Sequence, residues 1–98
     1  MDVAHADSDP ERLEADPSFD AGYGSALVKV FRKRLQLIRA ANDERDFYAL
    51  KSLHYEKLRG KRSHQRSMRL NRQWRLILEI ENASPGRRVI VRGIEDYH

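Results

Sequence analysis

Apolar residues recur at helical spacing in the stretch that begins at Ser25. Five of them fall three or four positions apart and would share one helix face: Leu27, Phe31, Leu35, Ile38 and Ala41. Basic residues occupy most of the opposite face, and the hydroxyl of Ser25 is suited to cap the first turn. The pattern therefore predicts an amphipathic helix over residues 25–41.

A second, shorter helix is expected over residues 44–53. Asn42 or Asp43 supplies a side-chain oxygen suited to the N-cap of this helix. Phe47 and Leu50 lie three positions apart and would both point toward the core. The two helices would therefore pack against the same apolar surface.

Beyond residue 53 the hydrophobic period shortens to the value of two that is typical of strands. The predicted strands cover residues 54–59, 65–70, 73–80 and 88–94. In the third strand, one face carries Trp74, Leu76, Leu78 and Ile80, and the other carries Arg75, Ile77 and Glu79. Turn-forming residues at 71–72 and 82–86 would join neighbouring strands as hairpins, which predicts an antiparallel meander.

The element order predicts an α+β fold in which two N-terminal helices pack on one face of a small twisted antiparallel sheet. The other sheet face would remain open. Residues 1–24 contain two prolines, two glycines and seven acidic residues, and they are expected to form an acidic, largely irregular lead. A chain of 98 residues has room for one core, so residues 25–98 would form a single domain.

Charge is distributed unevenly along the chain, although the net charge is only +4. Acidic residues outnumber basic residues by six in the first 24 positions, and eight basic residues lie without any acidic one between Lys57 and Arg75. Such a block attracts polyanions, nucleic acid first, although a solvated basic face is the ordinary alternative. Because this block lies on predicted strands and includes Trp74, His64 and Asn71, we favour nucleic-acid binding.

Several site classes are excluded or disfavoured by composition. The chain has no cysteine, which excludes disulfides, thiolate metal sites and a cysteine nucleophile. Its four histidines show no paired spacing, so no metal and no cofactor are expected. No apolar run is long enough to span a bilayer, and the first residues do not form a secretion signal, so we expect a cytoplasmic protein with no membrane partner.

Arginines on or between the predicted strands suggest phosphate chemistry on the open sheet face. If that face gathers Arg59, Arg62, Arg69 and Arg75, their guanidinium groups would bind phosphate oxygens and stabilise a charged transition state. The candidates for proton transfer are Glu56, His54, Asp96, Tyr97 and His98. RNA cleavage through the 2′-hydroxyl needs a base and an acid but no metal, so these residues are compatible with a ribonuclease.

Most of these residues also have an ordinary structural interpretation. His54 would be a partly buried spacer, Glu56 would only pair with an arginine, and Trp74 would belong to the core rather than stack on a base. The last three residues would be an ordinary polar end.

Three motifs carry a resemblance to a known family. They are Lys-Leu-Arg-Gly-Lys-Arg at 57–62, Ser-Met-Arg-Leu-Asn-Arg-Gln-Trp-Arg at 67–75, and Asp-Tyr-His at 96–98. In this order and spacing they resemble the HigB branch of the RelE-like toxins, from Ser25 to the last residue. The order of helix, helix and meander agrees with the fold of that family.

The resemblance implies the toxin of a type II toxin–antitoxin system. Such a toxin is a ribosome-dependent endoribonuclease that cuts mRNA in the ribosomal A site. A helix-turn-helix antitoxin, encoded adjacently, would bind and silence it, and operator DNA would be contacted only through the antitoxin.

The resemblance also assigns roles by position. Asp96, Tyr97 and His98 match the terminal catalytic motif, and Glu56 falls where relatives place His or Glu. Arg75 matches a basic position expected to hold mRNA or ribosomal phosphates and is counted with the catalytic residues. The residues expected to bind RNA or ribosomal phosphates are Lys57, Arg59, Lys61, Arg62 and Arg69. His54 is a weaker substitute for Glu56, because on a strand the two side chains would share a face.

This sequence departs from the family in the turn that follows Gly60. An acidic residue, a second glycine and an aromatic residue of the relatives are replaced by Lys61, His64 and Arg66. Relatives also begin with a short apolar strand, so the sheet would lack an edge strand here or obtain it weakly from residues 2–6. Two alternatives to the toxin nuclease therefore stay open: a catalytically silent antitoxin-binding or regulatory module, and a ribosome-independent RNA-binding protein.

Overall fold

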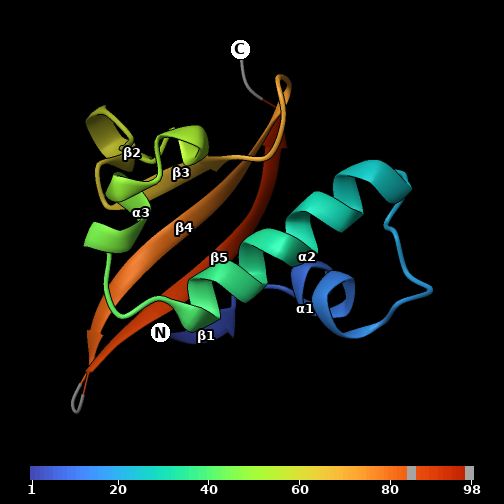
Figure 1. Ribbon diagram of the computed structural model, residues 1–98, viewed down its shortest axis with the longest axis horizontal. Helices are drawn as coiled ribbons and strands as arrows, with labels where there is room; N and C mark the ends of the chain where they lie inside the picture. Colours follow the sequence, from blue (N-terminus) through green and yellow to red (C-terminus); the bar gives the residue numbers. More distant parts are fainter. Residues whose placement is uncertain (84–85, 97–98) are drawn as a thin grey trace.

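The computed structural model describes residues 1–83 and 86–96, which form a five-stranded sheet with helices against one face (Figure 1). The elements are β1 (Asp2–His5), α1 (Ser8–Ala15), α2 (Ser25–Ala40), α3 (Arg45–Ala49), the 3-10 turn η1 (Lys51–Leu53), β2 (Glu56–Lys57), the 3-10 turn η2 (Gly60–Arg62), β3 (Gln65–Arg69), β4 (Trp74–Ala83) and β5 (Gly86–Asp96). The strand order is β1-β5-β4-β3-β2; β1 runs parallel to β5, and the other pairs are antiparallel. The predicted α+β class is confirmed, with a mixed rather than wholly antiparallel sheet.

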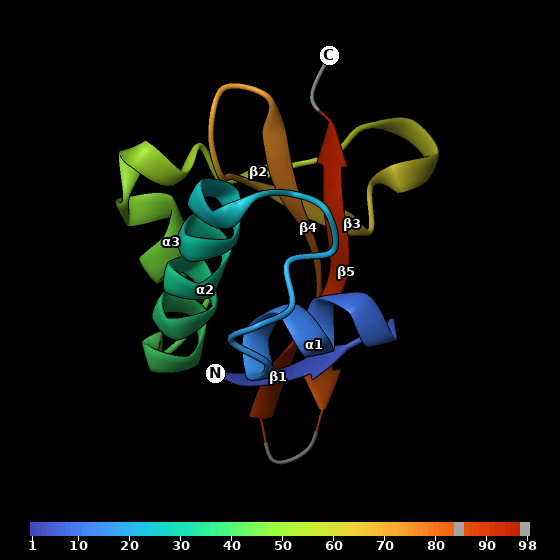
Figure 2. The ribbon, with the colours of Figure 1, turned by 90° about the vertical axis from the view of Figure 1, so that its right-hand side faces the viewer.

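The long helix α2 supplies the helical half of the core. Its apolar face buries Phe31, Leu35 and Ile38 completely, as the spacing predicted. Figure 2 shows α2 and α3 on the same side of the sheet, so the opposite face stays open. The predicted cap is wrong: Gly24 precedes the helix with φ of 87°, and Ser25 is the first helical residue.

The second predicted helix is divided into α3 and η1. Phe47 is fully buried as expected, but Leu50 is 44% exposed, so its predicted inward position is wrong. The cause is the backbone, because Leu50 leaves the helical conformation with φ of −96° and ψ of 93°. The helical spacing that would have turned its side chain inward is lost at this residue.

The predicted strands at 65–70, 73–80 and 88–94 are confirmed by β3, β4 and β5, and β4 and β5 extend further than expected. Leu76 and Leu78 are fully buried under the helices, whereas Arg75 and Ile77 lie on the other face. The strand expected over 54–59 is reduced to β2. His54 has a left-handed backbone, with φ of 46° and ψ of 47°, and so does not join the strand. The predicted shared face of His54 and Glu56 is therefore wrong.

Residues 1–24 are not largely irregular, which corrects the sequence expectation. Here β1 pairs along β5, and α1 buries Leu13 in the core at 1% exposure. The N-terminal ammonium donates to the carbonyl oxygens of Ile38, Arg39 and Ala41 at the end of α2. The edge strand that the sequence offered weakly at residues 2–6 is present as β1. The helix α1 was harder to predict, because its apolar residues are few.

Arg32 connects α1 to α2. Its guanidinium donates to the carbonyl oxygens of Leu13, Asp16 and Phe19, which lie at and beyond the C-terminal end of α1. A positive charge there stabilises the negative end of the helix dipole.

Among the described residues, none of the helices has the length and apolar character that a membrane span requires.

Candidate functional site

Arg75 lies at the centre of the open sheet face. The strand register places it opposite Arg69 on β3 and Glu95 on β5. Ser67 lies two positions from Arg69 along β3, opposite Ile77, and pairs on its other side with Glu56 of β2. Side chains that are distant in sequence thus meet because four strands present them on one face.

The Arg75 guanidinium is fixed by groups on neighbouring elements. Only 7% of the residue is exposed, and its Nη2 donates to the carbonyl oxygen of His54 at 2.6 Å and to the hydroxyl oxygen of Ser67 at 2.7 Å. The Glu56 carboxylate lies 3.6 Å from the same nitrogen. The left-handed backbone of His54 is what turns its carbonyl oxygen toward this arginine. A buried cation that is held in this way is ready to bind an anion without rearrangement.

A cleft of about 260 Å³ opens beside Arg75 and reaches the end of β5. Its lining residues are Leu58, Arg62, Ser67, Arg75, Ile77, Glu95 and Asp96. Gln73 donates to the Asp96 carboxylate at 3.2 Å. We call this the carboxylate cleft, because it combines two guanidinium groups with the carboxylates of Glu95 and Asp96.

Arg62 and Glu95 are joined in the carboxylate cleft. Nη1 and Nη2 of Arg62 donate to the two carboxylate oxygens of Glu95 at 2.9 and 2.7 Å, and Nε donates to Gln65 at 2.8 Å. The hydrogen bond and charge of Glu95 raise the pKa of Arg62 above its ordinary value. The predicted phosphate ligand Arg62 is therefore already paired with an acidic residue.

A second cleft, of about 370 Å³, lies between Arg75 and the turn that joins β3 to β4. Its lining residues are His54, Arg69, Asn71, Arg72 and Arg75. Arg69 donates to the carbonyl oxygen of Asn71 at 3.3 Å and lies 3.3 Å from Nε2 of His54. We call this the arginine cleft; Arg75 lines both clefts.

The structure brings together only part of the predicted site. Arg62, Arg75 and Asp96 line the carboxylate cleft, His54 and Arg69 line the arginine cleft, and Glu56 lies at Arg75. The exposed side chains of Lys57, Arg59 and Lys61 line neither cleft. Tyr97 and His98 lie outside the described residues.

Two residues of the site were missed in the sequence. Ser67 is 2% exposed and accepts from Arg75, and Glu95 pairs with Arg62. Strand alternation places Ser67 on the open sheet face, since Met68 beside it faces the helices. No local signal in the sequence marks Glu95, because its partner lies 33 positions away.

Two of the three departures from the resembled family, His64 and Arg66, lie near acidic side chains. Arg66 donates to the Glu44 carboxylate at 3.0 Å, and the same oxygen accepts the Tyr55 hydroxyl at 2.7 Å. Burial, followed by this hydrogen bond, raises the pKa of Tyr55. His64 lies 3.8 Å from Glu79 and is largely exposed. Arg66 thus fixes α3 to the sheet by an ion pair.

Trp74 packs as a structural residue. Its ring meets that of Tyr23 edge to face at 5.5 Å, and it lies against the core. This agrees with the core interpretation rather than with a base-stacking platform.

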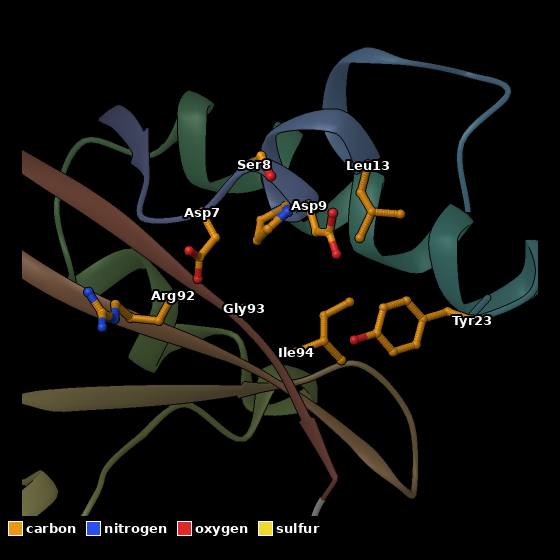
Figure 3. Close-up of a pocket in the computed structure, with 9 residues that line it drawn as sticks. Asp7, Ser8, Asp9, Leu13, Tyr23, Arg92, Gly93 and Ile94 are labelled. Carbon is orange, nitrogen blue, oxygen red and sulfur yellow. The ribbon is translucent and has the colours of Figure 1, made fainter. Parts of the chain in front are cut away.

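A third hollow, of about 300 Å³, lies away from both clefts, between the start of α1 and β5 (Figure 3). Asp7, Asp9, Tyr23, Arg92 and Ile94 are among its lining residues, and it contains no predicted site residue.

Within residues 1–83 and 86–96, no group of three acidic or histidine side chains is placed to hold a metal ion.

Comparison with known proteins gives a family and a fold. The family model described as the RelE-like toxin of type II toxin–antitoxin system HigB matches residues 7–98. Among solved structures, the chain is similar to a YoeB/ParE toxin from Agrobacterium tumefaciens, with 17% sequence identity, 100% of each chain covered and a TM-score of 0.62. At this identity the structural likeness supports the fold alone. No curated protein matches the chain.

Proposed function

Since this chain belongs to the HigB-like family of RelE-like toxins of type II toxin–antitoxin systems, we propose that it is an endoribonuclease that cuts mRNA in the ribosomal A site. The match includes all three motifs at 57–62, 67–75 and 96–98. One observation carries the proposal: the buried Arg75 guanidinium and the Asp96 carboxylate line the same cleft on the open sheet face.

The cleft supports cleavage by the 2′-hydroxyl of the RNA itself. A base removes the hydroxyl proton, the 2′-oxygen attacks the adjacent phosphorus, and the bond to the 5′-oxygen breaks as an acid protonates that oxygen. The products are a 2′,3′-cyclic phosphate and a free 5′-hydroxyl. Arg75 would stabilise the charge that develops on the phosphate oxygens, because Ser67 and His54 already hold it in place.

We assign the proton transfers to the carboxylates at Arg75 and to the end of the chain. Glu56, at 3.6 Å from Arg75, and Asp96 are the described candidates, together with Tyr97 and His98 of the terminal motif. The exposed Lys57, Arg59 and Lys61 would bind ribosomal or message phosphates around the cleft. No step in this scheme requires a metal.

The family also supplies the partner. We propose that a helix-turn-helix antitoxin, encoded adjacently, binds and silences this toxin, and that operator DNA is reached only through the antitoxin. An adjacent reading frame that lacks such a motif would argue against this assignment.

A purified translation reaction tests the endoribonuclease directly. The message is mapped by primer extension after addition of wild type, His98→Ala, Tyr97→Ala or the control Tyr48→Phe, whose ring is half exposed on α3. We expect cleavage only with ribosomes, its loss in the two terminal variants, and wild-type cleavage in the control. Cleavage of naked RNA would favour the ribosome-independent alternative. No cleavage by wild type in any condition would favour the silent antitoxin-binding module.

A further inference from the structure

The arginine cleft differs in charge from the carboxylate cleft across Arg75. The carboxylate cleft has two guanidinium groups and two carboxylates among its lining residues. The arginine cleft has three guanidinium groups, and none of the described residues that line it is acidic. The first cleft therefore combines cations with carboxylates, whereas the second combines three cations with His54 and Asn71 and should attract negative charge more strongly.

Two of the three arginines in the arginine cleft, Arg69 and Arg72, differ from other arginines of the sheet in having no acidic partner among the described residues. Arg66 pairs with Glu44, Arg92 pairs with Glu79, and Arg75 lies near Glu56. By contrast, Arg69 contacts the carbonyl oxygen of Asn71 and the imidazole of His54. Within residues 1–83 and 86–96, no carboxylate pairs with Arg72, whose side chain is exposed.

The turn that presents Arg72 is held in one conformation. The Asn71 side-chain oxygen accepts the backbone N–H groups of Gln73 and Trp74, both at 2.8 Å. The N–H groups of Leu70 and Asn71 both donate to the carbonyl oxygen of Trp74. Side-chain hydrogen bonds of this kind preorganise a turn, so the backbone of Arg72 has a defined position beside the cleft.

His54 adds a polar imidazole to the same cleft. Its Nε2 lies 3.3 Å from Nη1 of Arg69. The imidazole therefore contacts the Arg69 guanidinium at the cleft.

From this arrangement we infer that the arginine cleft is a second phosphate subsite for single-stranded RNA, in which Arg69 and Arg72 bind the phosphodiester next to the one at Arg75. The inference rests on the proposed function in one respect, because that function places the scissile phosphate of the RNA in the carboxylate cleft. Arg75 lines both clefts, so the two clefts are neighbours. Arg72 is the new ligand, and Asn71 is a positioning residue.

Nuclear magnetic resonance of the ¹⁵N-labelled full chain tests the subsite with two probes, inorganic phosphate and a trinucleotide whose 2′-hydroxyls are methylated. Because the methylated RNA cannot be cut, binding is measured separately from cleavage. We expect phosphate to shift the amide signals of Asn71 and Arg72, and the trinucleotide to shift these together with those of Glu95 and Asp96. Arg72→Ala should weaken trinucleotide binding about three- to fivefold, the range of one exposed charge contact.

The matched control is Arg87→Ala, which removes an exposed arginine from β5 outside both clefts. Equal affinities of the two variants, or no shift at Asn71 and Arg72, would overturn the subsite. Phosphate binding without trinucleotide binding would also overturn it, because the cleft would then be a simple anion site. Binding that depends on Arg72 in a protein that never cuts mRNA would retain the subsite and reject the endoribonuclease.

Discussion

Arg62 and Glu95 form a two-pronged ion pair between η2 and the end of β5, with N–O distances of 2.9 and 2.7 Å. Both side chains are about half exposed, at 45% and 46%. The pair lies in the cleft that contains Arg75 and Asp96. Glu95 therefore already binds the Arg62 guanidinium, which the resemblance to the family predicts to bind phosphate.

Removing the charge of Glu95 should therefore release Arg62 for RNA. We expect Glu95→Gln to bind the methylated, uncleavable RNA about threefold more tightly and to lose at most about 1 kcal/mol of stability, as exposed pairs do. Fluorescence anisotropy gives the affinity and urea unfolding gives the stability. Glu81→Gln is the control, because it breaks the similarly exposed pair with Arg88 for the same change in net charge. Equal RNA affinities of the two variants would show that Glu95 does not compete with RNA for Arg62.

Ser67 should act on cleavage through Arg75. Ser67→Ala removes the hydroxyl oxygen that accepts a hydrogen bond from the Arg75 Nη2, and weakening the hydrogen bonding of a buried donor costs about 1 to 3 kcal/mol of stability. We expect about a tenfold loss of cleavage rate at saturating ribosomes, equivalent to about 1.4 kcal/mol of transition-state stabilisation. Ser63→Ala on the exposed turn is the control. A wild-type rate with lowered stability would give Ser67 a structural role only.

The acidic N-terminal segment should contribute to stability as part of the core. Leu13 is 1% exposed, so Leu13→Ala should lower the free energy of unfolding by about 2 to 5 kcal/mol. Leu50→Ala removes the same atoms from a side chain that is 44% exposed and should change it by at most about 0.5 kcal/mol. Urea unfolding of both variants decides the point. Similar values for the two would mean that α1 is not packed as described.

Glu14 should make the stability of the fold depend on pH in the acidic range. Its pKa lies below the ordinary value of 4.5, chiefly because Arg39 donates two hydrogen bonds of 2.7 Å, with a further contribution from His5. A carboxyl group whose folded-state pKa is lowered stabilises the fold above its ordinary pKa, and this stabilisation is lost as the pH falls through the lowered value.

Glu14→Gln should therefore cost about 1 kcal/mol at neutral pH, or about 4 to 8 °C in Tm for a domain of this size. The Tm difference from wild type should shrink as the pH falls below 4.5. Thermal unfolding across this pH range measures it, with Glu11→Gln, exposed on the same helix, as the control. A Tm difference that does not vary with pH would exclude the ion pair as its source.

The sequence by itself determined the local structure of α2 and β4 and the family. Apolar spacing within α2 and alternation along β4 depend on neighbouring positions alone, so they predicted the buried face of Phe31 and Leu35 and the opposite face for Arg75. The three motifs likewise indicated the family that matches residues 7–98. The catalytic roles of Tyr97 and His98 stay predictions.

Only the tertiary structure decided which charges are paired and which surround the clefts. Arg62 meets Glu95, Arg66 meets Glu44, and Arg69 remains without a described acidic partner, although all three belong to one basic block in the sequence. These outcomes depend on strand register and on contacts between residues 22 to 33 positions apart, which hydrophobic periodicity does not specify. The order β1-β5-β4-β3-β2 likewise brings the N-terminal segment beside β5, because pairing with an edge strand satisfies backbone groups whatever the charge of nearby side chains.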